Sequence, residues 1–322
     1  MKATCTEILR AAPRCPNGTQ RESLASVFMR TAEENDRSPA LLLKGKFSEL
    51  SQFGAHYAGR AMGGVFGQTL NGSSHQTQAT VERIEQLTQL TNLRASTTLA
   101  FAPFATPNGL LRKHLAWDPT KLANDSYYPL LWALEPVKVC SESRKPLVCL
   151  CPRCRSQLPT LTGSSRVGEC YRCRHPLSKV TNENSSAEPI ARTIQSLDYE
   201  VWIAQQLGEF IEFQIQGSLP ADFNYTETLR YWFDKFDLRK SRSSAAVLGV
   251  SQPSISIWFS TGAIPKLRAT LNLCWVFGVS LLQFLRQEVP PAHNGILVKP
   301  IDTDRPQLFE PPRVLVRDVV MG

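Results

Sequence analysis

The sequence contains no apolar stretch that is both long enough and free enough of charge to cross a membrane. The longest one, residues 267–285, includes Arg268 and is interrupted at Gly278, which predicts two buried helices instead. The first residues, MKATCTEILRAAPRC, lack the apolar core of a secretory signal. We therefore expect a soluble, intracellular protein that has no membrane partner.

Features of an enzyme are also scarce. We find neither a phosphate-binding glycine loop nor a pair of carboxylates at a useful spacing. The five histidines are scattered along the chain and have no recognisable partners: His56, His75, His114, His175 and His293. The sequence thus predicts a protein without catalytic activity.

Cysteine spacing provides the strongest motif. The chain has nine cysteines, an odd number that argues against a complete set of disulfides. Two Cys-x-x-Cys pairs stand fifteen residues apart in CPRCRSQLPTLTGSSRVGECYRC, residues 151–173. Four thiolates suit tetrahedral Zn²⁺, and a site filled by four protein ligands has no position left for catalysis. We predict one structural zinc ion held by Cys151, Cys154, Cys170 and Cys173.

The charge balance favours a polyanionic partner. The formal net charge is +8, and residues 144–179 contain a single acid, Glu169, among eight basic residues. Two interpretations stay open, because such a segment can neutralise phosphates or can simply be a solvated surface. The basic residues are Arg144, Lys145, Arg153, Arg155, Arg166, Arg172, Arg174 and Lys179.

Residues 244–285 follow the pattern of a repressor-type helix-turn-helix. Ser251 is expected to cap the second helix, Pro253 to stand in its first turn, and Ile255 and Trp258 to face the core. Exposed polar residues of that helix would read base edges, while basic residues nearby would contact phosphates. The candidates are Gln252, Ser254, Ser256 and Ser260 for bases, and Arg239, Lys240, Arg242 and Lys266 for phosphates. A helix-turn-helix that contacts protein is the alternative.

Apolar periodicity predicts a mainly α, multidomain protein. Helices are expected over residues 20–36 and 80–91, with a loop over 71–78 between them. The expected units are an N-terminal helical domain (1–110), a central four-cysteine zinc knuckle or ribbon (111–180), a C-terminal helical domain with the helix-turn-helix (181–289) and a Pro-rich tail (290–322).

Several stretches resemble, in the same order, the TniQ family of target-selection proteins from Tn7-like and CRISPR-associated transposons. The first is Glu22-Ser23-Leu24-Ala25-Ser26, followed by Arg30, Ala32 and Asn35. The likeness continues in ERIEQLTQLTNLRASTTLAF (82–101) and in LLWALEPVKVCSESRKPLVCLCPRCRSQL (130–158). Together with the helix-turn-helix, the resemblance covers residues 16 to about 285.

The resemblance implies a non-catalytic adaptor of the bacterial cytoplasm that joins the nucleoid when active. It would link a target-marking module, either a CRISPR effector complex or its own domain bound to target DNA, to an AAA+ transposition regulator. A stand-alone helix-turn-helix transcription regulator with a structural zinc is the alternative. Whether the chain acts as a homodimer stays open.

Two details of the resemblance concern particular residues. Likeness is strongest in the N-terminal helix, where Glu22, Arg30 and Glu34 are expected to form a polar face that contacts the ATPase. Charge reversal at Arg30 would then abolish recruitment and leave the melting temperature unchanged.

A second detail is a departure from the family, which commonly has another metal site built from an upstream Cys-Pro-x-Cys and a Cys-x-x-His. Here LLRKHLAWDPTKLAND (110–125) has no cysteine, and Ser143 stands where the histidine would fall after Cys140. We expect one zinc ion per chain, with Cys140 and His114 as packing residues.

Overall fold

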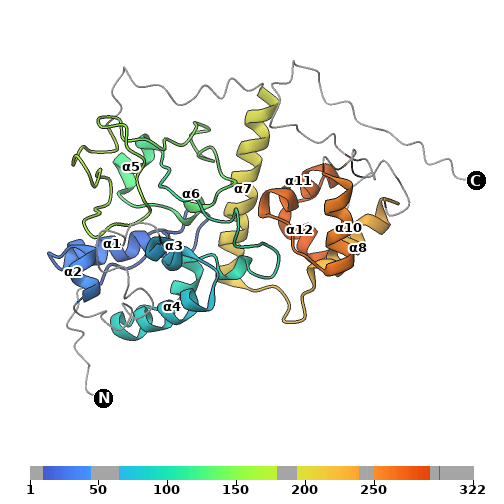
Figure 1. Ribbon diagram of the computed structural model, residues 1–322, viewed down its shortest axis with the longest axis horizontal. Coiled ribbons are helices and arrows are strands. Elements are labelled where there is room, and N and C mark those ends of the chain that lie inside the picture. The colour runs from blue at the N-terminus through green and yellow to red at the C-terminus, as the bar shows by residue number, and fades with distance from the viewer. Residues whose placement is uncertain are drawn as a thin grey trace, which may run out of the picture.

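The computed structural model describes residues 10–44, 65–179, 194–238 and 250–290, together with residues 245, 248 and 297. In these ranges the secondary structure consists of helices and isolated β-bridges (Figure 1), so the predicted mainly α fold class is confirmed for the described residues. The helices are α1 (Leu24–Glu34), α2 (Pro39–Lys44), α3 (Val65–Asn71), α4 (His75–Thr88), η3 (Leu93–Ser96), η4 (Leu99–Phe101), α5 (Pro119–Asp125), α6 (Leu130–Ala133), α7 (Ile194–Gln216), α8 (Tyr225–Lys235), α10 (Gln252–Thr261), α11 (Leu267–Phe277) and α12 (Leu281–Arg286).

Helix α1 begins where its capping sequence predicts. The Ser23 hydroxyl accepts a hydrogen bond from the backbone N–H of Ser26, which satisfies one of the free donors at the start of the helix. Every residue from Leu24 to Met29 is buried, and so are Thr31 and Ala32. Because burial extends around most of its circumference, α1 is a core helix.

The loop expected over residues 71–78 is wrong in its second half. Helix α4 already begins at His75, because the hydroxyl of Ser74 accepts a hydrogen bond from the N–H of Thr77 and caps the first turn. The Thr77 hydroxyl in turn donates to the carbonyl of Thr69 at 2.8 Å. These polar residues form a helix start, since their side chains are satisfied by nearby backbone groups.

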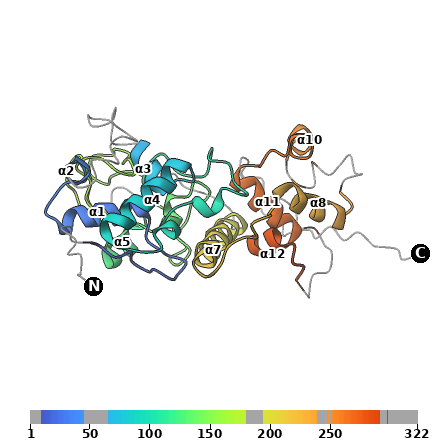
Figure 2. The same cartoon turned by 90° about the horizontal axis from the view of Figure 1, so that it is seen from below.

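Helix α7 runs through the middle of the molecule, between the N-terminal helices and the C-terminal group α8 to α12 (Figures 1 and 2). On one side its Phe210 packs edge to face against Phe101 and Phe104, with ring centroids 4.7 and 4.9 Å apart. On the other side the Gln206 side chain accepts a hydrogen bond of 2.8 Å from the backbone N–H of Leu281, at the start of α12. A single helix therefore packs against both ends of the described chain.

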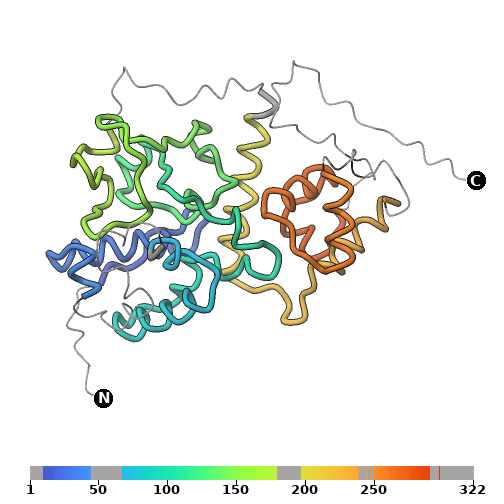
Figure 3. Tube along the Cα trace, viewed as in Figure 1, coloured from blue at the N-terminus to red at the C-terminus, as the bar shows by residue number. Residues whose placement is uncertain are grey.

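Aromatic packing holds the C-terminal helices together, and Figure 3 traces their path. The Trp232 ring of α8 stacks on Phe277 of α11 and Phe284 of α12, with both centroid distances at 5.9 Å. Phe233, also on α8, packs edge to face against Phe259 of α10 at 5.0 Å. These contacts fix the orientation of α10, whose outer face is a candidate binding surface.

The core is continuous from the N-terminal to the C-terminal helices. One cluster of buried apolar side chains extends from Leu24 to Leu285. The division into units 1–110, 111–180 and 181–289 stays a prediction, and the tail 290–322 lies outside the described residues apart from Pro290 and Leu297. None of the helices in the described ranges is long and apolar enough to cross a membrane.

Candidate metal centre

Two similar backbone turns position the four cysteines. In each turn the N–H of an arginine donates to the carbonyl of the first cysteine: Arg155 to Cys151 at 3.0 Å and Arg174 to Cys170 at 2.9 Å. Both arginines adopt left-handed backbone conformations, with φ of 58° and 59°. Such a conformation costs an L-residue about 1 kcal/mol or more, which the hydrogen bonds of the turns help to offset.

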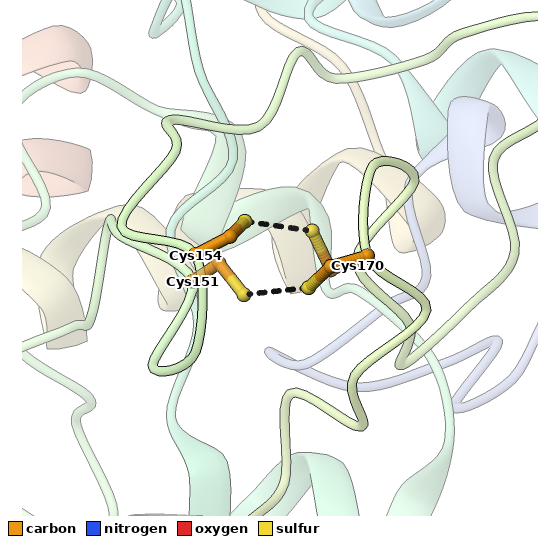
Figure 4. A group of neighbouring side chains, drawn as sticks. Cys151, Cys154 and Cys170 are labelled. Carbon is orange, nitrogen blue, oxygen red and sulfur yellow. Dashed lines mark hydrogen bonds between the residues drawn. The ribbon is translucent and has the colours of Figure 1, made fainter.

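The sulfur atoms of the two turns face one another across a small gap (Figure 4). Cys151 Sγ lies 3.7 Å from Cys173 Sγ, and Cys154 Sγ lies 3.6 Å from Cys170 Sγ. All four sulfurs lie within 4.8 Å of one another. Zinc bound tetrahedrally with Zn–S distances of about 2.3 Å requires sulfurs about 3.8 Å apart. The predicted ligands thus form one group that could hold a metal ion, with dimensions consistent with zinc.

The pKa values of the thiols are compatible with a bound cation. Burial is the largest influence on the pKa of Cys151 and raises it to about 12, although N–H groups of Cys154 and Arg153 oppose this effect. Burial also acts on Cys154, but hydrogen bonds with Ser156 and with the thiols of Cys173 and Cys151 outweigh it, and the pKa falls to about 6. Four neighbouring thiols cannot all ionise by themselves, whereas a divalent cation would let four thiolates coexist.

Arginines surround the cysteine group. Arg153, Arg155, Arg172 and Arg174 are all exposed. Arg172 donates to the Ser156 hydroxyl at 3.0 Å, which links one turn to the other. This segment therefore carries positive charge at the surface, and its role, phosphate contact or solvated charge, stays open.

Helix α10 has the local structure that the sequence predicts. The Ser251 hydroxyl caps it by accepting from the N–H of Ser254, Pro253 stands in the first turn, and Ile255 and Trp258 are buried. The helix-turn-helix itself stays a prediction, because most of the helix expected before α10 lies outside the described residues.

The candidate DNA-binding residues fall into three groups. Gln252, Ser256, Ser260 and Lys266 are exposed, as base or phosphate contact requires. Ser254 is half-buried, and its hydroxyl lies 2.7 Å from that of the cap residue, Ser251. Arg239, Lys240 and Arg242 lie outside the described residues.

One exposed residue of α10 was missed by the sequence analysis. Ile257 is 50% exposed on the same helix as Ser256 and Ser260. The sequence does indicate an uncharged surface on this helix, because no charged residue occurs between Arg242 and Lys266. The outer face of α10 is therefore uncharged and partly apolar.

The expected partner-binding face of the N-terminal helix needs correction. Glu22 has a side-chain exposure of 0%, and Arg30, at 12%, forms an ion pair with it across 2.6 Å. Only Glu34 is exposed. The surface position expected for Glu22 and Arg30 is wrong, because both side chains satisfy each other inside the fold. Contact of Glu34 with a partner stays a prediction.

The two packing residues expected from the resemblance to TniQ proteins differ in outcome. Cys140 is buried, with 1% exposure, whereas His114 is exposed, so the expectation that it is a packing residue is wrong. Comparison of the chain with protein-family models gives no match, and comparison with curated proteins gives none either. The likeness to TniQ proteins therefore rests on the motifs and their order.

Proposed function

We propose that this chain is a non-catalytic adaptor in DNA transposition. It would link a module that marks the target, either a CRISPR effector complex or target DNA bound by the C-terminal helices, to an AAA+ transposition regulator. The observation that carries the proposal is that α7 packs against the N-terminal helices through Phe210 and against the C-terminal helices through Gln206. The order of the TniQ-like motifs is what points to transposition rather than to another process.

An adaptor needs its binding surfaces at a fixed separation and orientation. Glu200 of α7 is buried and accepts two hydrogen bonds from Arg268 of α11, at 2.6 and 3.3 Å. Arg268 also donates to the carbonyl of Pro136 at 3.1 Å. This pair tolerates little relative movement, because separation would leave the buried Glu200 carboxylate without its charge partner. Three distant segments are thereby held together.

We infer that the metal ion is a single structural Zn²⁺. Thiolates occupy all four positions of the group formed by Cys151, Cys154, Cys170 and Cys173, so no position is left for a substrate or a reactive water. The ion would join two turns in a region of residues 102–179 that has few helices of its own. In this role the metal supports the geometry of the adaptor and takes no part in chemistry.

The outer face of α10 would contact the target-marking module. Because this helix carries no charge, phosphate contacts would come from Arg239, Lys240, Arg242 and Lys266 rather than from α10 itself. Gln252 and the serines offer few bidentate bonds to bases, which implies weak sequence discrimination. The exposed side chain of Ile257 suits an apolar partner or a thymine methyl group.

Salt dependence tests where nucleic acid binds. For the Arg239→Gln/Arg242→Gln variant, the slope of log K against log salt concentration should become less negative by about 1.8. The reason is that binding of this variant releases about two fewer counterions from DNA. Gln252→Ala should change the affinity for random DNA little. Fluorescence anisotropy over a salt series measures both effects.

A matched variant removes two charges from the cysteine turns instead. Arg153→Gln/Arg172→Gln should leave the slope unchanged, since both arginines belong to segment 151–174, which lies on the other side of α7 from α10 (Figure 1). If this variant makes the slope less negative and Arg239→Gln/Arg242→Gln does not, nucleic acid binds at the cysteine turns and α10 contacts protein.

Partner dependence tests the adaptor role. Sedimentation of the full chain with a cognate AAA+ regulator, ATP and duplex DNA should give a complex that contains both proteins. A stand-alone transcription regulator would bind one DNA sequence at least about 10³-fold more tightly than random DNA, without the ATPase. That result, with no association of the two proteins, would replace the adaptor by the regulator.

A further inference from the structure

A third turn repeats the backbone geometry of the two cysteine turns, although it lacks their second cysteine. The N–H of Cys140 donates to the carbonyl of Lys145, and the N–H of Arg144 donates to the carbonyl of Cys140, both at 2.9 Å. The four corresponding bonds of the cysteine turns measure 2.9 or 3.0 Å. Arg144 has φ of 56°, next to 58° and 59° for the equivalent arginines. An isolated antiparallel bridge flanks each of the three turns: Val139 with Pro146, Leu150 with Gln157, and Glu169 with Pro176.

A fourth turn begins at Asp118. Its carboxylate accepts hydrogen bonds from the N–H groups two and three positions further on, at Thr120 (2.9 Å) and Lys121 (3.4 Å). The thiols of Cys151 and Cys170 accept hydrogen bonds from the N–H groups at the same two offsets. A proline follows both Asp118 and Cys151. The residues Asp-Pro-Thr-Lys thus occupy the place of a Cys-Pro-x-Cys pair and continue into helix α5.

These last two turns contact each other as the cysteine turns do. The first residue of one, Asp118, accepts a hydrogen bond of 2.5 Å from the last residue of the other, Ser143. In the cysteine group the first residue of one turn also lies next to the last residue of the other. The thiol of Cys140 hydrogen-bonds to the same carboxylate, and Lys121 pairs with Glu142 at 2.6 Å. Asp118 itself is 1% exposed, whereas the Lys121–Glu142 pair lies at the surface, with the Glu142 side chain 55% exposed.

We propose that residues 118–121 and 140–143 form a metal-free counterpart of the cysteine group, in which the buried Asp118 carboxylate joins two knuckle turns in place of a metal ion. In the cysteine group an ion would bridge the turns through four thiolates. In the counterpart one carboxylate bridges them, because it accepts hydrogen bonds from the backbone of its own turn and from Ser143 and Cys140 of the other. The proposal does not depend on the proposed function.

The residues of the counterpart do not suit a metal ion. Among its four ligand positions only Cys140 offers a thiol, and Lys121 brings a positive charge that repels a cation. Hydrogen bonds already occupy both oxygens of Asp118. Within the described residues, only the four cysteines form a group that could hold a metal.

The ionisation of Asp118 agrees with this arrangement. Burial would raise the pKa of its carboxyl group, but hydrogen bonds from Ser143, Thr120, Cys140 and Lys121 outweigh burial and lower it. The group is therefore an anion at neutral pH, as a charge-assisted acceptor of several hydrogen bonds should be.

Metal stoichiometry tests the proposal directly. The natural protein, loaded with Co²⁺, should bind one ion per chain. The Asp118→Cys/Lys121→Cys/Ser143→Cys variant combines three new thiols with Cys140 and should bind two, with about twice the visible absorption of tetrahedral thiolate-bound Co²⁺. Adding Cys140→Ser to this variant should return the count to one. Two ions in the natural protein, or one ion in a folded triple variant, would overturn the proposal.

A single substitution covers the case in which the triple variant does not fold. Ser143→Ala removes the donor between the turns and should lower the midpoint of thermal unfolding by about 5 °C, while the metal count stays at one. Ser164→Ala, at an exposed serine of the neighbouring loop, is the matched control and should shift the midpoint little. An equal midpoint for the two variants would contradict the joining role of Asp118.

Discussion

Replacing Cys154 by serine is expected to release the metal ion and to open both turns that the ion joins. Structural zinc contributes on the order of 10 kcal/mol of apparent binding free energy at neutral pH, far more than any single hydrogen bond of these turns. The three remaining thiolates cannot close a tetrahedral site around the ion. Elemental analysis of the purified variant should find well under one zinc per chain, and amide hydrogen exchange should rise over residues 151–177.

Cys149→Ser is the matched control for this experiment. Cys149 lies two residues before the cysteine group, but its thiol donates a hydrogen bond to the carbonyl of Leu147, at 3.9 Å, and its sulfur is not among the four of the group. This variant should keep one zinc per chain and normal exchange. Full zinc in Cys154→Ser, or natural protein purified without zinc, would refute the metal assignment.

Replacing Arg30 by methionine is expected to destabilise the protein by about 3–5 kcal/mol, because it leaves the buried carboxylate of Glu22 without its charge partner. Glu22 accepts hydrogen bonds from Arg30, from the Ser26 hydroxyl at 2.7 Å and from the N–H of Arg14 at 2.8 Å. Charge reversal at Arg30 should be more damaging still. Thermal unfolding of both variants at neutral pH measures the effect, with a midpoint about 10 °C lower for Arg30→Met.

Two further variants isolate the ion pair. Glu22→Gln/Arg30→Met removes both charges and should recover part of the loss, whereas Glu34→Gln, which removes an exposed partner 3.8 Å from Arg30, should change stability by less than about 0.5 kcal/mol. A double variant no more stable than Arg30→Met would mean that packing of the arginine stem, and not charge, accounts for the loss.

The pH dependence has a defined sign. Burial is the largest influence on the pKa of Glu22 and raises it, although Arg30, Ser26 and Arg14 act in the opposite direction. A carboxyl whose pKa is higher in the folded state stabilises the fold when protonated, and this contribution is lost as pH rises through the folded pKa. Without Arg30 that pKa should rise further. The deficit of Arg30→Met should therefore shrink as the pH falls below neutral, which denaturant unfolding at several pH values would detect.

Several features follow from short stretches of sequence and could be predicted. The two cysteines of each pair belong to one short turn, which backbone hydrogen bonds close within residues 151–156 and within residues 170–175. Helices α1 and α10 begin directly after Ser23 and Ser251, because each serine hydroxyl accepts a hydrogen bond from the N–H three residues further on. In each case the interacting groups are close in the sequence.

Tertiary structure alone decided which charges are buried. A glutamate just before a helix is usually found at the surface. Here a β-bridge between Glu22 and Pro129, and a hydrogen bond from the Ser23 N–H to the Tyr128 carbonyl, bring a distant segment over Glu22. The position of Asp118 depends in the same way on Ser143, twenty-five residues further along the chain. No local pattern encodes such pairings.

The difference between local and long-range interactions also explains why the sequence predicts the cysteine group but not its metal-free counterpart. Two Cys-x-x-Cys pairs predict a metal site from the sequence, because the ligands of zinc are restricted to a few residue types at regular spacing. A carboxylate that joins two turns by hydrogen bonds has no comparable signature, since aspartate, serine and lysine are common at any surface. The amino-acid sequence determined the local turns and the helix starts, whereas only the folded chain, through its long-range contacts, decided which polar groups lose water and must satisfy one another.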